Sequence, residues 1–418
     1  MKNQLIAVIL IVMLLLSIGA AFFVFNNKAA SNSPPKIQIN YPYDGETVSG
    51  LVSITGKAYD FDFNDFVTVE VKIDEDKWKS ADGSKEWSFS WDTTLFKDGK
   101  HVIYARAYDQ KQYSETEQVI VYVKNDDISS VHKWALLVAA CNFPEKDEQK
   151  LGNGGLYLAM NLSKYLINDC DYPPEHITIL FDDGWIRSDN GFGEKIAPLY
   201  EILEPKAVHS GAATVSNLEV VLTNLIDNAN RYNDSEVFIW IYNHGVGNDR
   251  YKFTGGKILE NSGIFMWDGI VKDSDLGSML GNLNAEKTCI IVDACYAGGF
   301  ANKAIFNLPS ILSSGIPKKG RIVITATSKF RKGYADIKKG PLFTQFWLEG
   351  LATGNADGYR PGLFKTGRKT FLPFFKDGKV SVEEAFYYAR CKLRSPQYIR
   401  YRSMQPQIND KIPGDTFL

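Results

Sequence analysis

His244 and Cys295 are the residues whose types and positions best support chemistry in this sequence. Each lies shortly after a run of apolar residues, VFIWIY at 237–242 and TCIIV at 288–292. A thiolate attacks a carbonyl carbon, and a nearby imidazole can remove the thiol proton and later protonate the leaving amine. If the two runs are neighbouring strands, the pair predicts a cysteine nucleophile with a separate histidine base.

Glycines follow both of these residues. Gly245 has no side chain to obstruct a substrate, so its backbone N–H and that of Cys295 are candidate donors to a developing oxyanion. Gly298 and Gly299 allow a tight turn into the next element. Taken alone, Cys295 is better interpreted as a small buried hydrophobe and His244 as a hydrogen-bonded loop residue. Together they favour a catalytic pair.

The other cysteines and histidines show no such pattern. Cys141 ends an apolar run and is the one further thiol that could line the site. An odd number of cysteines without paired short spacings supports neither a zinc site nor a disulfide framework, and we expect no metal or organic cofactor. The residues interpreted as structural are Cys170, Cys289, Cys391, His101, His132, His176 and His209.

Strand and helix patterns alternate from residue 130 onward, and these elements must position the pair. Residues 134–140 form a continuous apolar run, as expected of a strand buried on both faces. Ser216 and Glu219 form a capping-box pattern at the start of a helix. The alternation predicts an α/β domain with a mostly parallel sheet flanked by helices, in which chemistry gathers at the carboxyl ends of the strands. The expected strands are 134–140, 177–181, 237–242, 288–292 and 321–326, the expected helices are 155–168, 216–229, 273–283, 342–351 and 382–393, and the expected loops include 182–214 and 355–378.

Length and composition limit the alternatives. The chain has 418 residues, which allows about two to three domains at roughly 150 residues each. With 44% hydrophobic and 23% charged residues it is an ordinary globular composition, neither disordered nor a multi-span membrane protein. A net charge of −2 gives no electrostatic basis for nucleic-acid binding.

The first thirty residues contain an uncharged apolar run at 5–25. At about 1.5 Å per residue it is long enough to cross a hydrocarbon layer of roughly 30 Å. It is longer than the apolar core of most cleaved signal peptides, so we expect a single-pass signal anchor at 1–30, with a cleaved signal peptide as the alternative. The long chain that follows is expected to lie outside the cytoplasmic membrane.

Residues 31–125 show short apolar segments with a period of two, separated by turn signals such as Asp82-Gly83 and Asp98-Gly99. This pattern predicts a β-sandwich. The stretch 87–109, WSFSWDTTLFKDGKHVIYARAYD, resembles the immunoglobulin-like domains of bacterial and archaeal surface proteins. Such a module is interpreted as a spacer, or as a binder of a partner or sugar. Its acidic loop residues Asp60, Asp62 and Asp65 are either calcium ligands or simply solvated.

Residues 133 to about 410, within a domain at 130–418, resemble the caspase-like superfamily of cysteine peptidases, which place His-Gly after one strand and Cys-x-x-Gly after the next. Four further blocks resemble its legumain-like branch: Ala140-Cys-Asn142, ITILFDD at 177–183, Ala326-Thr-Ser328 running to Tyr334, and GPLFTQFWLEG at 340–350. The resemblance implies a caspase-like sheet and a thiol peptidase without a cofactor.

The resemblance also implies roles for individual residues. Cys295 is the nucleophile, His244 the general base and acid, and Asn142 an orienting residue. Gly245 and Cys295 supply the oxyanion N–H groups. A substrate pocket is implied near Ser328, Lys332 and Tyr334.

Two departures prevent transfer of the legumain preference for asparagine before the cleaved bond. Legumain relatives follow the asparagine with a basic pair, whereas residues 143–145 here are Phe-Pro-Glu. The segment after the fifth strand carries Lys329, Arg331 and Lys332. If these cations face the pocket they favour an acidic or amide side chain; the alternative is that they are exposed. Cleavage after arginine requires a buried carboxylate instead, for which Asp293 and Asp336 are the nearest candidates.

The leading functional hypothesis is therefore a cysteine endopeptidase that hydrolyses peptide bonds in peptide or protein substrates outside the cytoplasmic membrane. A transpeptidase acting through the same acyl-enzyme is an alternative. A catalytically silent surface binding or adhesion protein is a third hypothesis, but it would be expected to lack the nucleophile or the base, and both are present.

Overall fold

A computed structural model describes residues 32–60, 62, 67–125, 131–143, 150–247, 260–360 and 376–418. The predicted membrane segment at 5–25 lies outside these residues. Among the residues described, no helix combines the length and the apolar character needed to cross a membrane.

The predicted β module is present as two sheets. One has the strand order β1-β3-β7-β6 and the other β2-β9-β8-β4-β5. Inward-facing side chains such as Trp87, Val71 and Ile103 are buried, and they alternate with more exposed neighbours as in a β-sandwich. The strands are β1 (Lys36–Tyr41), β2 (Glu46–Val48), β3 (Leu51–Tyr59), β4 (Thr68–Ile73), β5 (Lys79–Ser80), β6 (Asp82–Gly83), β7 (Glu86–Asp92), β8 (Gly99–Tyr108) and β9 (Glu117–Val123).

The acidic loop of this module is partly described. Asp60 accepts the backbone N–H of Asp62, and the Asp62 carboxylate accepts the N–H of Ser33. Asp65 lies outside the described residues.

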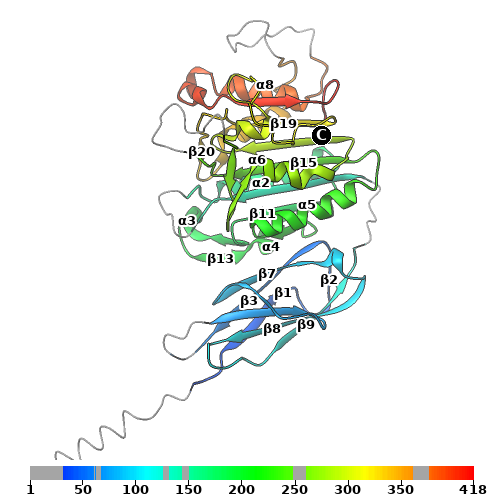
Figure 1. Cartoon of the computed structure of the whole chain (residues 1–418), viewed down its shortest axis with the longest axis vertical. Coiled ribbons are helices and arrows are strands. Elements are labelled where there is room, and N and C mark those ends of the chain that lie inside the picture. Colours follow the sequence, from blue (N-terminus) through cyan, green and yellow to red (C-terminus); the bar gives the residue numbers. More distant parts are fainter. Residues whose placement is uncertain are drawn as a thin grey trace, which may run out of the picture. The chain divides into compact units, whose positions relative to one another are not determined.

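The predicted α/β sheet is confirmed. It has seven strands in the order β14-β11-β10-β15-β18-β19-β22, all parallel except β22, which pairs antiparallel with β19 (Figure 1). The five predicted strands match to within two residues at each end. The strands are β10 (Lys133–Ala140), β11 (Ile177–Phe181), β14 (His209–Gly211), β15 (Glu236–Asn243), β18 (Lys287–Asp293), β19 (Arg321–Thr325) and β22 (Gln407–Asp410).

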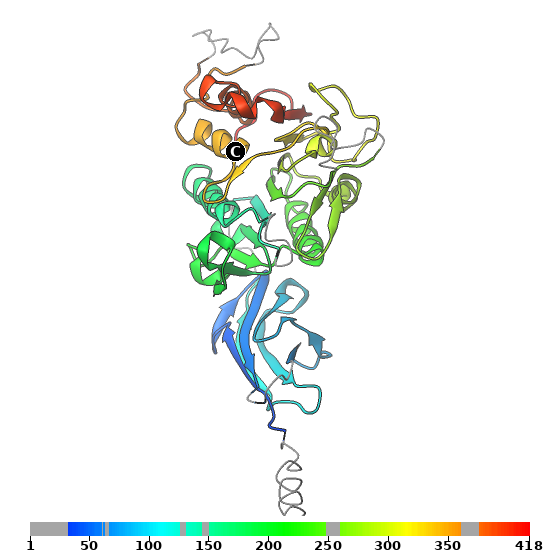
Figure 2. The ribbon, with the colours of Figure 1, turned by 90° about the vertical axis from the view of Figure 1, so that its left-hand side faces the viewer.

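Helices cover both faces of this sheet, because alternate residues of each strand point to opposite sides (Figure 2). On β10, Leu137 packs in one apolar cluster and Leu136 in the other. The first cluster contains side chains of α2 (Gly154–Asp169), α7 (Leu342–Ala352) and α8 (Val382–Lys392), and the second contains those of α5 (Val215–Ala229) and α6 (Asp273–Met279). The core therefore consists of two apolar layers with the sheet between them.

The capping prediction for α5 is wrong by two residues. The N-cap is Thr214, whose hydroxyl accepts the N–H of Asn217. The Asp268 carboxylate accepts the N–H of Val215. Orphan donors of the first turn are therefore satisfied before Ser216, and the helix begins earlier.

Two further segments differ from expectation. The predicted helix at 273–283 is α6 followed by a 3-10 turn, η4 (Leu280–Asn282). The expected loop at 182–214 contains short elements: β12 (Trp185–Arg187), α3 (Ser188–Gly191), β13 (Lys195–Pro198), α4 (Leu199–Ile202) and the edge strand β14. Of the other expected loop, residues 361–375 lie outside the described part.

Candidate active site

Strand register brings the two predicted catalytic residues to the same edge. β15 and β18 are parallel neighbours, and their last paired residues are Tyr242 and Asp293. His244 and Cys295 each follow two residues later, so both leave the sheet at the carboxyl edge at equal distance along their strands. This is the edge at which parallel α/β sheets carry their chemistry.

Gly245 and Cys295 approach each other through their backbones. A Cβ atom built on Gly245 would lie 1.7 Å from the carbonyl oxygen of Cys295 and 3.0 Å from its Cα. No side chain fits there. The His-Gly segment is thus packed directly against the cysteine, which places the histidine beside the thiol-bearing residue without requiring any other element to connect them.

Replacing Gly245 with alanine should therefore damage the site. We expect overpacking to destabilise the fold by about 1–3 kcal/mol, and a shift of the two segments by about 1 Å to lower peptide turnover roughly 100-fold. Gly281→Ala is the matched control, because a Cβ there would have no atom within 4 Å. Thermal unfolding and turnover of both variants test this, and a Gly245→Ala protein with wild-type turnover would contradict the close approach.

Cys295 lies in a sharp turn between β18 and the 3-10 helix η5 (Ala297–Ala301). The next residue, Tyr296, has φ of 59°, a left-handed conformation that a large side chain rarely adopts and that is common at functional sites. The backbone N–H of Gly333 donates to the Cys295 sulfur at 3.2 Å. A donor directed at sulfur favours the thiolate over the thiol, which is the form that attacks.

The two predicted oxyanion donors lie on these touching segments. Within the part of the chain that the structure describes, the Gly245 N–H donates to no other group, while its neighbours are held by the bonds Phe265 N–H to His244 O and Val246 N–H to Gly263 O. The segment is fixed but this donor is available to a substrate oxygen, as an oxyanion hole requires.

Gly298 and Gly299 are needed for close packing rather than for an unusual φ. A Cβ on Gly298 would lie 2.5 Å from the backbone nitrogen of Lys329, and one on Gly299 would lie 2.2 Å from Oδ2 of Asp273. The turn into η5 is therefore tightly enclosed.

The structure places Asn142 in a buried polar cluster rather than in a bond to His244. Its backbone N–H and its side-chain amide donate to Asp182, and the amide also donates to Asn153. Its side-chain oxygen has no partner among the described residues. Burial raises the pKa of Asp182 to about 7, although bonds from Cys141 and Asn142 oppose this. The cluster joins the residues that follow β10 to Asp182, which follows the neighbouring strand β11.

The three predicted pocket residues have different surroundings. Ser328 is buried, and its hydroxyl has no partner among the described residues. Lys332 is exposed, and Tyr334 is 40% exposed with its ring 5.1 Å from that of Tyr401. Gly333 between them contacts Cys295, so the segment does pass the candidate nucleophile.

The predicted cations also differ. Lys329 is buried, and its ammonium lies 3.5 Å from the Ser310 hydroxyl. Burial lowers the pKa of Lys329, partly offset by Asp273. Arg331 is half-buried, and its Nε has no partner in the described residues. Arg331 and Lys332 are thus the cations of this segment that reach solvent.

Of the two candidate carboxylates, Asp293 is the buried one. It accepts the N–H and the hydroxyl of Thr344 at 3.1 and 2.8 Å. Burial raises its pKa to about 7, although the two bonds from Thr344 act in the opposite direction. Asp336 is exposed and accepts the N–H groups of Lys338 and Lys339 in a turn.

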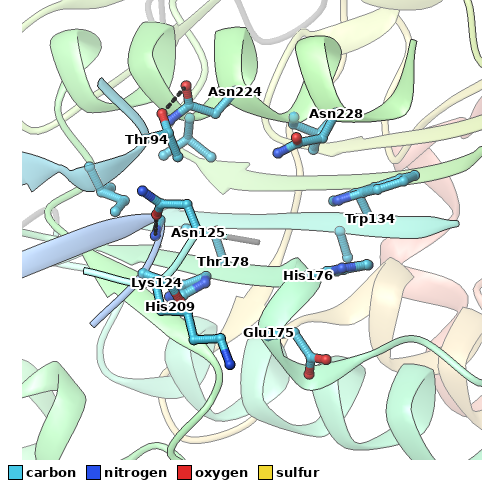
Figure 3. Close-up of a pocket in the computed structure, with 16 residues that line it drawn as sticks. Thr94, Lys124, Asn125, Trp134, Glu175, His176, Thr178, His209, Asn224 and Asn228 are labelled. Carbon is cyan, nitrogen blue, oxygen red and sulfur yellow. Dashed lines mark hydrogen bonds between the residues drawn. The ribbon is translucent and has the colours of Figure 1, made fainter. Parts of the chain in front are cut away.

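The other thiols and imidazoles lie elsewhere. Burial raises the pKa of Cys141, Cys170, Cys289 and Cys391, which disfavours their thiolates. Figure 3 shows His176 beside Trp134, with ring centroids 4.9 Å apart, and His209 farther along the same pocket. These residues lie at or just before the amino ends of β11, β14 and β10, opposite to the edge that carries Cys295. His132 contacts Asp234 at 2.7 Å.

Metal ligands are not clustered in the described ranges: no group of three or more His, Cys, Asp or Glu side chains there could hold a metal ion.

Comparison with known proteins identifies the β module. Residues 35–105 match the family model described as a bacterial Ig domain. No curated protein matches the chain.

Several solved structures show a distant likeness to this chain. An endo-beta-1,4-mannanase from Thermotoga petrophila shares 22% identity over 24% of this chain and 22% of its own, with a TM-score of 0.21. Fibronectin(III)-like modules of CbhA from Clostridium thermocellum share 22% over 24% of this chain and 51% of theirs, with a TM-score of 0.19. Caspase-1 from Spodoptera frugiperda shares 9% over 70% of this chain and 94% of its own, with a TM-score of 0.38.

Proposed function

We propose that this chain is a cysteine endopeptidase in which Cys295 is the nucleophile and His244 the general base and acid. The observation that carries the proposal is the approach of the His244-Gly245 segment to the backbone of Cys295 at the carboxyl edge of the sheet. A histidine, a thiol turned out by a sharp bend and an available backbone donor are the parts that acyl transfer requires.

The reaction proceeds in two balanced steps. His244 accepts the Cys295 proton, and sulfur bonds to the scissile carbonyl carbon while the carbonyl oxygen takes the negative charge. The N–H groups of Gly245 and Cys295 stabilise that oxygen. The C–N bond then breaks, and the amine leaves with the proton held by His244. Water, deprotonated by His244, attacks the thioester, and sulfur leaves as the thiol.

The finer assignment to the legumain-like branch is part of this proposal and is supported by the sequence blocks around Asn142, Ser328 and residues 340–350. So is the division into a membrane segment at 1–30, an immunoglobulin-like spacer at 31–125 and a catalytic domain at 130–418. In this arrangement the catalytic domain lies outside the cytoplasmic membrane, held there by residues 5–25.

A peptide library varied at the position before the cleaved bond tests the proposal and its specificity together. We expect the full chain to cleave and its Cys295→Ala variant to be silent. Preference for arginine or lysine would assign recognition to the buried carboxyl of Asp293, whereas preference for an acidic or amide residue would assign it to Arg331 and Lys332.

If neither protein cleaves before or after limited proteolysis, and Cys295 does not react with iodoacetamide, the chain is better explained as a binding protein.

A further inference from the structure

Two buried hydroxyls surround the turn that carries Cys295, and neither has a role in the chemistry above. Thr327 follows β19, and Ser262 lies just before the strand β16 (Gly263–Phe265). Both are buried, with exposed fractions of 0% and 3%. They come from elements on either side of the turn in the sequence, so their convergence on it is a property of the fold.

Thr327 bridges the turn from one residue before Cys295 to two residues after it. Its hydroxyl donates to the carbonyl oxygen of Ala294 at 2.7 Å and accepts the N–H of Ala297 at 3.0 Å. Its own carbonyl accepts the hydroxyl of Thr325 at 2.8 Å, which fixes the backbone of Thr327.

Ser262 bridges the next part of the turn, from Tyr296 to Gly299. Its hydroxyl donates to the carbonyl oxygen of Tyr296 at 2.6 Å and accepts the N–H of Gly299 at 3.1 Å. The backbone of Ser262 is itself held by Asp273 in two hydrogen bonds: its N–H donates to the Asp273 carboxylate, and its carbonyl accepts the Asp273 N–H.

These bonds fix whole peptide planes, because the peptide unit is rigid and trans. The carbonyl of Ala294 and the N–H of Cys295 belong to one plane, so the Thr327 bond sets the direction of the Cys295 N–H. The carbonyl of Tyr296 and the N–H of Ala297 belong to another, which Ser262 holds at one end and Thr327 at the other. The left-handed φ of Tyr296 lies between these two fixed planes.

We propose that Thr327 and Ser262 are positioning residues that hold the Cys295 turn so that the Cys295 N–H and sulfur both face the scissile carbonyl. This inference rests on the proposed peptidase function. Neither residue touches substrate; each acts through the backbone on either side of the nucleophile. Since an oxyanion donor contributes mainly in the transition state, the loss of its direction should lower kcat rather than raise KM.

The test compares Thr327→Val, which keeps the shape and removes the hydroxyl, with Thr327→Ser, which keeps the hydroxyl. We expect Thr327→Val to lower kcat roughly 10- to 100-fold with KM within about twofold, and Thr327→Ser to restore most of it. Alkylation of Cys295 by iodoacetamide, followed by peptide mapping, should require higher pH in Thr327→Val, because the sulfur leaves the Gly333 N–H that favours its thiolate.

Two further variants keep the test decisive. Ser262→Ala removes the second bridge and should act in the same direction, even if Thr327→Val fails to fold. Thr288→Val is the matched control, because its buried hydroxyl in β18 has no partner among the described residues. Thr327→Val and Ser262→Ala proteins that melt earlier but keep wild-type kcat and alkylation profiles would overturn the positioning role. A wild-type chain without turnover or a reactive Cys295 would instead overturn the proposed function.

Discussion

Replacing Cys295 with alanine is expected to lower peptide turnover by roughly four to six orders of magnitude, because the change removes the sulfur that forms the proposed acyl-enzyme. The fold should survive the change. Cys295 is only half-buried, and its sulfur contacts the backbone of Gly333, accepting the N–H at 3.2 Å and facing the carbonyl oxygen at 3.9 Å. The measurement is single-turnover cleavage of the best library peptide, together with thermal unfolding to show that the variant is folded.

Cys391→Ala is the control for this experiment, because it removes another half-buried thiol from α8. It should retain turnover and labelling by a peptide acyl ketone that reacts with thiols. If labelling persists in Cys295→Ala and disappears in Cys391→Ala, the reactive thiol is Cys391 and the assignment of Cys295 as nucleophile is wrong. Turnover retained by both variants would exclude a cysteine nucleophile.

The positions of His244 and Cys295 at one sheet edge could be predicted from sequence for a physical reason. Strands buried on both faces are continuous apolar runs, so β10, β15 and β18 can be recognised from the sequence alone. Parallel strands joined by helices all end at the same edge, so residues that follow two such runs must lie near each other. The short edge strands β14 and β22 were not predicted, because HSG and QIND carry no apolar run.

The residues that hydrogen-bond to the Cys295 turn could not be predicted from the sequence in this way. Gly333 contributes a backbone N–H, and Thr327 and Ser262 contribute single hydroxyls from loops. A backbone N–H is present in every residue except proline, so the sequence does not indicate which one donates to Cys295. Serine and threonine are common in loops, so their residue type does not indicate which hydroxyl will bond to the turn. Asn142 shows the opposite case, since its sequence block was recognisable but its amide is bonded within the Asp182 cluster.

Replacing His244 with alanine is expected to lower kcat roughly 100- to 10,000-fold, which is the usual contribution of a positioned acid–base group. The loss should depend on pH in a particular direction. Without the imidazole to accept the proton, less of the Cys295 thiol is ionised at neutral pH, and more of the thiolate forms as the solution becomes alkaline. Alkylation of Cys295 in the variant should therefore be slow at neutral pH and approach the wild-type rate in alkaline solution.

His176→Ala separates this effect from the general loss of an imidazole. His176 lies before β11 at the opposite edge of the sheet, so its removal should leave both turnover and the alkylation profile unchanged. Turnover of His244→Ala within about tenfold of wild type would be too small a loss for a general base and would assign proton transfer to another group. If the pH dependence of alkylation shifts equally in both variants, the two imidazoles affect the Cys295 thiol only through the long-range electrostatic field of the protein. A shift confined to His244→Ala would connect the imidazole to the thiol directly, as we expect from the close approach of the Gly245 and Cys295 backbones.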